Sequence, residues 1–158
     1  MRNSGMEQGV RRATAGLVSA LVLGLGVVSG ARAAETPTKL DGVKVVTAAE
    51  AKQMQDRGVP LIDTRVATEY AEKTIKGAQS IPYREKSAKD VKFDRTQDKF
   101  DLSKLPSDKN APVVFFCNAG ECWKSYKASV LALDAGYKQV HWLRGGMPEW
   151  TAKGLPTQ

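Results

Sequence analysis

Four consecutive apolar residues, Val113 to Phe116, run directly into Cys117 and constrain the fold more than any other part of the chain. An apolar run without alternation is typical of a strand that is buried on both faces, as in a parallel sheet. A short loop containing Gly120 follows, and then a predicted helix over residues 124–135 that Gly136 ends. The sequence therefore places a cysteine at the end of a buried strand and just before a helix.

The rest of the chain alternates short strand and helix patterns. Thr47 and Glu50 have the spacing of a capping box, which predicts the start of a helix that ends at Gly58. Other strands are predicted over residues 44–46, 61–63, 78–81 and 140–143, and other helical turns over residues 67–72 and 148–153. This order predicts an α/β fold with a parallel sheet. Ligands of such sheets bind beyond the carboxyl ends of the strands, which is where Cys117 is predicted to lie.

Residues 1–33 have the composition of a secretory signal peptide. Arg11 and Arg12 supply a positive start, an uncharged and largely apolar stretch follows, and residues 31–33, Ala-Arg-Ala, match a cleavage site. An uncleaved membrane anchor is the alternative, although glycine and serine dilute the apolar stretch. Cleavage would leave a mature chain that begins at Ala34, is periplasmic or secreted, and has no stable membrane insertion.

For residues 34–158, charge and cysteine content argue against a nucleic-acid-binding protein and a disulfide-rich scaffold. Removal of residues 1–33 lowers the formal net charge from +7 to +4, with 20 basic and 16 acidic residues left. No run of Lys and Arg is interleaved with aromatic residues, so we expect no nucleic acid as a partner. Two cysteines are too few for a disulfide scaffold. We expect residues 34–42 to be a flexible lead-in and residues 43–158 to form one domain.

The segment 84–111 has the least regular pattern and is rich in Lys, Arg and Asp. A stretch of this length without clear elements is either functional or a surface excursion. We expect a surface excursion that is pinned by Phe93, Phe100, Leu102 and Leu105. It could also form one wall of a site.

The loop after Cys117 has the character of an anion site. It consists of Asn118, Ala119, Gly120, Glu121, Cys122, Trp123 and Lys124. Backbone amides of a tight loop at a helix N-terminus can converge on one point and attract an anion, and the same field favours a thiolate over a thiol. We therefore predict Cys117 as the catalytic nucleophile and these seven loop residues as the substrate-binding segment.

Three further segments give the chain a family resemblance. They are Leu61–Arg65, with an Asp-x-Arg element, Glu69–Ala78, where Thr74 stands in place of a usual histidine, and Leu143–Trp150, with a Gly-Gly…Trp signature. In this order around a strand-terminal cysteine, they resemble the rhodanese family over nearly all of the mature chain. The resemblance implies a five-stranded, mostly parallel α/β sheet and a sulfurtransferase. Its cysteine would take sulfur from a donor such as thiosulfate, hold it as a persulfide and pass it to an acceptor such as cyanide or a thiol.

The loop departs from the family pattern in one respect. Rhodanese loops usually carry a basic residue five positions after the cysteine, or six in relatives that handle phosphate or arsenate. Here Cys122 and Trp123 occupy those positions, and Lys124 supplies the first basic side chain. No arginine within the loop can clamp a tetrahedral oxyanion, which disfavours an arsenate reductase or a phosphatase.

Cys122 and Lys124 each have two interpretations. Cys122 is either a loop residue or disulfide partner without a catalytic role, or a resolving, sulfur-accepting cysteine. We expect both thiols to be free, because a disulfide-closed loop this short would be strained. Lys124 either binds the anionic donor or only lies on the first helical turn.

Three other polar residues are expected to be structural. Asp63 and Arg65 fix a strand end through hydrogen bonds, and His141, the single histidine, packs within a strand. No Cys/His cluster is apparent, so we expect no metal and no other cofactor. The expected partners are a small anionic sulfur donor and a thiophilic acceptor. The alternative function is a non-enzymatic rhodanese-like module in the cell envelope that binds an anion or senses redox state.

Overall fold

The structure is a computed structural model that describes residues 34–158, so the predicted signal peptide lies outside the described residues. The strands are β1 (Val43–Val45), β2 (Leu61–Asp63), β3 (Gln79–Ser80), β4 (Pro112–Phe116) and β5 (Gln139–Leu143). The helices are α1 (Ala48–Asp56), α2 (Ala67–Glu72), α3 (Trp123–Asp134) and α4 (Gly146–Ala152), with a short 3-10 helix at Leu102–Lys104. The strands form one sheet in the order β1-β5-β4-β2-β3, and every pairing is parallel. This confirms the predicted five-stranded α/β fold.

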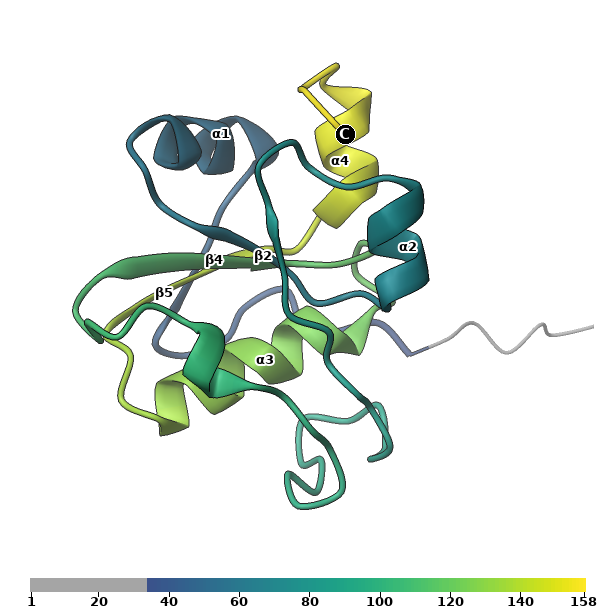
Figure 1. The fold of residues 1–158 in the computed structure, drawn as a ribbon. Coiled ribbons are helices and arrows are strands. Elements are labelled where there is room, and N and C mark those ends of the chain that lie inside the picture. The colour runs from purple at the N-terminus through teal and green to yellow at the C-terminus, as the bar shows by residue number, and fades with distance from the viewer. Residues whose placement is uncertain (1–33) are drawn as a thin grey trace, which may run out of the picture. The chain divides into compact units, whose positions relative to one another are not determined.

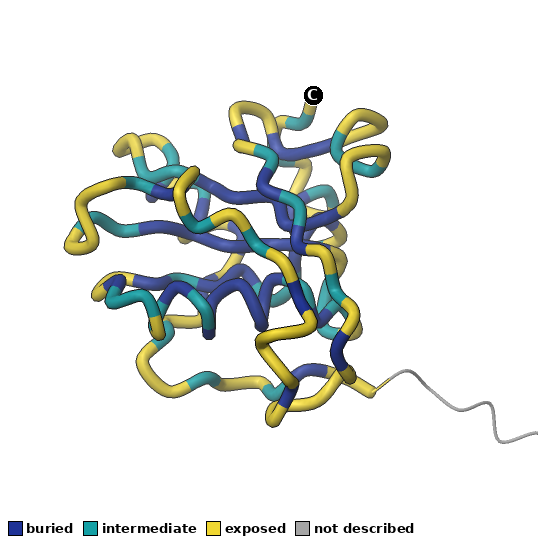
Figure 2. Tube along the Cα trace, turned by 60° about the horizontal axis from the view of Figure 1, so that its bottom comes forward, coloured by how far each residue is buried: buried dark blue, intermediate teal, exposed yellow. Residues whose placement is uncertain are grey.

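Helices cover both faces of the sheet (Figure 1). α1 and α4 lie on one face, α3 lies on the other, and α2 lies beside the end of the sheet. β2, most of β4 and β5, and the inner side of α3 are buried, whereas the edge strands β1 and β3 and the connecting segments are more exposed (Figure 2). No helix within residues 34–158 is long and apolar enough to cross a membrane.

The central strand β4 supplies side chains to two separate cores. Val114 and Phe116 pack in the cluster under α1 and α4, whereas Val113 and Phe115 pack in the cluster under α3. None of the four has measurable exposure to solvent. The uninterrupted apolar run is thus explained by burial of alternate residues on opposite faces.

The predicted helix start at Thr47 is confirmed in detail. The backbone N–H of Glu50 donates to Thr47 Oγ1 at 3.2 Å, and the N–H of Thr47 donates to Glu50 Oε2 at 2.8 Å. A second cap comes from across the fold, because Glu149 Oε1 accepts the N–H of Ala48 at 2.8 Å. The first turn of α1 is therefore fixed to α4 as well as to its own cap.

α4 begins two residues earlier than predicted. Gly145 takes the N-cap position, so the helix starts at Gly146 and Pro148 falls within its first turn. The first few backbone N–H groups of a helix have no intrahelical acceptor, so a proline as the third residue costs no hydrogen bond. Pro148 therefore fits inside the first turn as well as at its first position. β3 is shorter than predicted, with only Gln79 and Ser80 in the ladder.

The excursion over residues 84–111 is held by a buried lysine of α3. Lys127 has no measurable exposure, and its Nζ donates to Ser87 Oγ at 2.8 Å and lies 3.5 Å from carboxylate oxygens of Glu85 and Asp98. Burial raises the pKa of Asp98, but hydrogen bonds from Ser87, Lys86 and Tyr83 outweigh it and lower the pKa to about 2. The ion pair between Lys127 and Asp98 therefore fastens the excursion to the helix.

The apolar anchors predicted for the excursion also face inward. Phe93 and Leu105 are buried, and Phe100 and Leu102 are half-buried against the core under α3. This part of the prediction is confirmed, and Lys127 adds a polar anchor to it.

Asp63 and Arg65 form a buried ion pair at the end of β2. Arg65 Nη2 donates to Asp63 Oδ2 at 2.7 Å, and the same oxygen accepts the hydroxyl of Thr74 at 2.7 Å. Arg65 also donates to the carbonyl of Lys73 at 2.6 Å. These contacts confirm the structural role predicted for the pair, and they give Thr74 a place in the same network.

Candidate functional site

Cys117 lies at the carboxyl end of β4, between β2 and β5 in the sheet. It is 1% exposed, and α3 begins a few residues later at Trp123. This is the position at which parallel α/β sheets place their ligands. The predicted location of the cysteine is therefore confirmed.

The start of α4 holds the backbone of Cys117. The N–H of Met147 donates to the carbonyl of Cys117 at 2.9 Å. Gly146 has a φ of +54°, and a Cβ there would overlap the carbonyl oxygen of Cys117 and lie 2.7 Å from the nitrogen of Ala119. Two backbones can approach this closely only because residue 146 has no side chain.

The structure joins Cys117 and Cys122 in a disulfide, with 6.3 Å between their Cα atoms. The expectation of two free thiols is therefore wrong for this form of the chain. The physical reason is a turn within the loop: the N–H of Cys122 donates to the carbonyl of Ala119 at 3.2 Å, and Ala119 has a φ of +53°. This left-handed residue brings the two Cα atoms within the range that a disulfide spans.

Two polar atoms lie against the sulfur of Cys117. The carbonyl oxygen of Cys122 is 3.2 Å from Sγ, and the hydroxyl of Ser125 is 3.0 Å from it. Neither is a backbone amide, so the expected convergence of loop amides on this sulfur is not the arrangement in the disulfide form. The hydroxyl of Ser125, from the first turn of α3, contacts the sulfur in place of the expected backbone amides.

Trp142 determines which way the Ser125 hydroxyl points. The indole N–H of Trp142, on β5, donates to Ser125 Oγ at 2.9 Å. The hydroxyl oxygen thus accepts from the indole, and its own proton is free to donate to Cys117 Sγ. A donor aimed at a sulfur stabilises the thiolate and disfavours its protonation. All three side chains are buried, which strengthens the interaction.

Ser125→Ala is expected to slow the reaction of reduced Cys117 with iodoacetamide at neutral pH by about 10- to 100-fold, since a hydrogen bond to a charged group is lost. The rate is measured against pH in a Cys122→Ser background, and its half-maximal point moves to higher pH. Ser129→Ala is the matched control, because Ser129 is equally buried but donates to the backbone carbonyl of Ser125. Equal rates in the Ser125 and Ser129 variants would contradict the assignment.

An open cavity of about 260 Å³ lies over the loop. Five of the seven predicted binding residues line it: Asn118, Glu121, Cys122, Trp123 and Lys124. Glu85 and Lys89 of the excursion close its other side, so residues 84–111 do form a wall of the site. Cys122 is half-buried and lines this cavity, whereas Cys117 is buried and is not part of the lining.

The other two predicted residues serve the shape of the loop. Ala119 supplies the turn, and the carbonyl of Gly120 accepts both the N–H and the hydroxyl of Thr36, at 2.7 and 2.8 Å. A Cβ on Gly120 would lie 2.6 Å from the guanidinium of Arg144, which itself donates to the carbonyls of Thr36 and Pro37. The structure gives neither residue a place in the lining of the cavity.

Residues 34–37 cross the loop and are held to it. Thr36 is 3% exposed, and the indole N–H of Trp123 donates to the carbonyl of Ala34 at 2.7 Å. Part of the segment expected as a flexible lead-in is thus hydrogen-bonded to Gly120, Trp123 and Arg144. We call residues 34–37 the N-terminal strap.

His141 lies apart from this chemistry. It is on β5, half-buried, and its Nδ1 is 3.1 Å from the carbonyl of Gln139. Burial lowers the pKa of His141, so the ring is neutral at pH 7. It lies within the strand as predicted.

Within residues 34–158, no group of three His, Cys, Asp or Glu side chains is placed to hold a metal ion.

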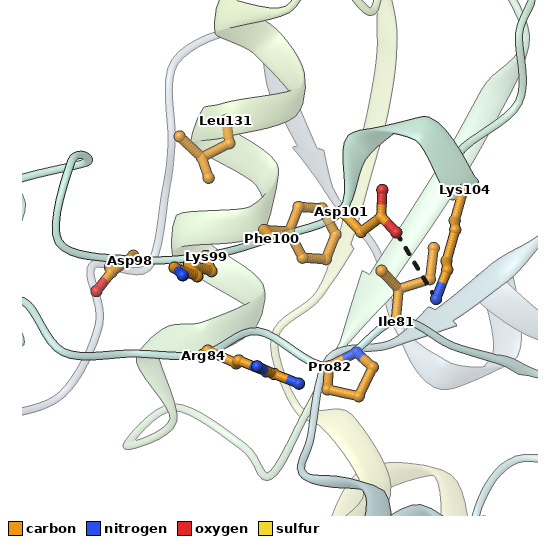
Figure 3. A pocket seen from close by; sticks show the side chains of 9 residues that line it. All are labelled: Ile81, Pro82, Arg84, Asp98, Lys99, Phe100, Asp101, Lys104 and Leu131. Carbon is orange, nitrogen blue, oxygen red and sulfur yellow. Dashed lines mark ion pairs between the residues drawn. The ribbon is translucent and has the colours of Figure 1, made fainter.

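A larger cavity of about 550 Å³ lies beneath the excursion (Figure 3). Phe100 and Leu131 form its apolar wall, and Lys104 pairs with Asp101 across 3.7 Å at its rim. It contains neither cysteine, and its charged groups have mixed sign. The loop at Cys117 is the candidate site because it carries the predicted nucleophile, lies against the Ser125 hydroxyl and lines an open cavity.

Sequence reasoning missed Ser125, Trp142, Arg144 and the strap. Ser125 could have been found, because on a predicted helix it falls one turn from the loop and can face back toward Cys117. The neighbours of Trp142 and Arg144 in the sequence do not indicate their roles. Trp142 acts through its contact with Ser125 on α3, and Arg144 acts through residues 36 and 37, which precede β1.

Comparison with known proteins finds similar sequences and similar solved structures. A relative from Allochromatium vinosum described as a sulfurtransferase is 31% identical over 98 residues, 62% of this chain and 77% of that protein. An HTH-type transcriptional regulator from Mycobacterium tuberculosis is 34% identical over 112 residues, 70% of this chain but 43% of the regulator. The human single-domain sulfurtransferase TSTD1 superposes with a TM-score of 0.50 at 26% identity, covering 69% of this chain and 96% of its own.

A family model matches most of the described part of the chain. The model of the rhodanese-like domain covers residues 47–153, from the N-cap of α1 to the end of α4. The match contains the Asp63–Arg65 pair, the Cys117 loop and the Gly145–Gly146 turn. The chain therefore belongs to the rhodanese-like domain family.

Proposed function

We propose that the chain is a thiosulfate-type sulfurtransferase that carries sulfur as a persulfide on Cys117. The observation that supports it most directly is the Ser125 hydroxyl, 3.0 Å from Cys117 Sγ and oriented by Trp142. A thiolate at this position attacks the sulfane sulfur of the donor, the S–S bond of thiosulfate breaks, and sulfite leaves with the bonding electrons. An acceptor nucleophile then takes the outer sulfur and restores the thiolate.

The disulfide form cannot accept sulfur, because Cys117 has no free thiolate while it is bonded to Cys122. Reduction of this bond is therefore the first step of the proposed reaction. Activity should depend on prior exposure to a thiol reductant.

The test is mass spectrometry of the reduced Cys122→Ser variant, in which Cys117 is the only cysteine, after treatment with thiosulfate and removal of excess donor. We expect the peptide that contains Cys117 to gain one sulfur atom, which cyanide then removes. A reduced variant that gains no sulfur would refute the proposal. The oxidised wild-type chain serves as the control and should gain none.

Lys124→Ala is expected to raise the KM for thiosulfate several-fold at low salt, because a positive charge that lines the cavity attracts the dianion. Added salt should reduce the difference, since screening acts over about 10 Å at 0.1 M ionic strength. Lys153→Ala is the control, because Lys153 is exposed at the end of α4. A KM that is unchanged at low salt would leave Lys124 with no role in binding the donor.

The proposal includes export to the periplasm or medium, on the basis of the sequence of residues 1–33. The mature chain should begin at Ala34, which would place its new amino group beside Trp123. Sequencing of the N-terminus of the exported protein checks this. A chain recovered with Met1 or Met6 at its start would contradict it.

A redox-sensing module is the second candidate function, and the disulfide between Cys117 and Cys122 is the observation that favours it. Such a module would cycle between dithiol and disulfide without carrying sulfur. The mass measurement separates the two functions, because only a sulfurtransferase gains sulfur in the reduced form.

A further inference from the structure

We propose that Cys122 resolves the Cys117 persulfide, so that the sulfur leaves as hydrosulfide and an external dithiol recharges the chain. The inference rests on the proposed function, because it requires the persulfide to form. It adds a product, a second reacting cysteine and a class of partner.

The loop already holds the two sulfurs at bonding contact. The Cα atoms are 6.3 Å apart, and the turn at Ala119 is built from residues between the two cysteines. No movement of β4 or α3 is needed for Cys122 to reach Cys117 Sγ. When Sγ carries an additional sulfur, the Cys122 thiolate can attack that same Sγ from the position it occupies in the disulfide.

The step balances without an added oxidant. The Cys122 thiol loses its proton, its sulfur forms a bond to Cys117 Sγ, and the S–S bond of the persulfide breaks. The outer sulfur leaves with the bonding electrons and takes the proton, so the products are hydrosulfide and the Cys117–Cys122 disulfide. The sulfane sulfur is reduced, and the two cysteines are oxidised.

Exposure of the two sulfurs determines how the disulfide is reduced again. Cys117 is 1% exposed, whereas Cys122 is half-buried and lines the open cavity. An external dithiol therefore attacks Cys122, and Cys117 departs as a thiolate that receives the hydrogen bond from Ser125. The second thiol of the reductant then displaces Cys122 and leaves as part of a disulfide. The partner is a dithiol that can reach the cavity, and the net reaction turns thiosulfate and a dithiol into sulfite, hydrosulfide and a disulfide.

A single-turnover experiment tests the proposal. The full-length mature chain is reduced, freed of reductant under argon and mixed with one equivalent of thiosulfate. Monobromobimane then labels sulfite, hydrosulfide and free thiols for quantification. We expect the wild-type chain to release sulfite and hydrosulfide in equal amounts and to end as the Cys117–Cys122 disulfide.

Cys122→Ser should stop at the persulfide. It should release sulfite but less than roughly one tenth of the wild-type hydrosulfide, because no second thiolate lies against Cys117. Cys122→Ala is made alongside it, since a loss caused by the new hydroxyl would be confined to the serine variant. The same arrest in both variants supports the resolving role.

Two other outcomes overturn the inference in distinguishable ways. Sulfite without hydrosulfide from the wild-type chain, with a stable persulfide on Cys117 or on Cys122, refutes the resolving step but leaves the sulfurtransferase intact. No sulfite and no bound sulfur refutes the sulfurtransferase itself, and the resolving step with it.

Discussion

Cys117→Ser is expected to abolish persulfide formation and to lower thiosulfate-dependent turnover by on the order of 10³-fold or more, the scale seen when a nucleophile is removed. Serine has nearly the size of cysteine, but its hydroxyl does not ionise at neutral pH and carries no sulfur. The measurement is sulfite release with cyanide as acceptor, after reduction of the wild-type disulfide.

The fold of this variant needs its own control, because Cys117 also forms the disulfide. Cys122→Ser removes the same disulfide and keeps the nucleophile. Urea unfolding of both variants shows whether loss of the bond alone accounts for any change in stability. Turnover by Cys117→Ser that stays near the level of the wild-type chain would refute the assignment of the nucleophile.

Gly146→Ala is expected to lower the free energy of unfolding by roughly 2–5 kcal/mol, the sum of left-handed backbone strain and overpacking. The added Cβ would overlap the carbonyl oxygen of Cys117, and that carbonyl belongs to the backbone and cannot rotate away. Relief requires α4 or the Cys117 loop to shift. We therefore expect the variant to lose most of its sulfur transfer as well.

Gly154→Ala is the matched control for this experiment. Gly154 has a φ of +65°, close to that of Gly146, but a Cβ there meets nothing within 4 Å. It should cost only about 1–2 kcal/mol, from backbone strain alone. Equal losses of stability in the two variants would show that contact with the Cys117 backbone does not matter.

Local patterns in the sequence determined the central elements of the fold. The apolar run before Cys117 predicted β4, and the Thr47–Glu50 spacing predicted the start of α1. Both signals act over a few residues and depend on burial or on a single hydrogen-bonded turn, so they can be recognised without knowledge of the rest of the chain. The alternation of such elements then restricted the topology to a parallel sheet.

The environment of the Cys117 sulfur depends on the tertiary structure. The sequence placed Cys117 at a strand end but gave the wrong redox state for Cys122, because a single left-handed residue, Ala119, closes the loop. Residues that surround this loop come from distant segments: Trp142 aligns Ser125, and Thr36 holds Gly120.

Strand burial and helix capping are local properties, so the sequence was enough to predict the fold and to place Cys117 at the end of β4. What lies against the Cys117 sulfur depends on contacts between distant segments of the chain. Ser125 is eight residues from Cys117, but its hydroxyl is aimed by an indole seventeen residues further on, and the strap reaches Gly120 from 84 residues away. Contacts over such separations follow from strand order and loop path, which no short pattern in a sequence records.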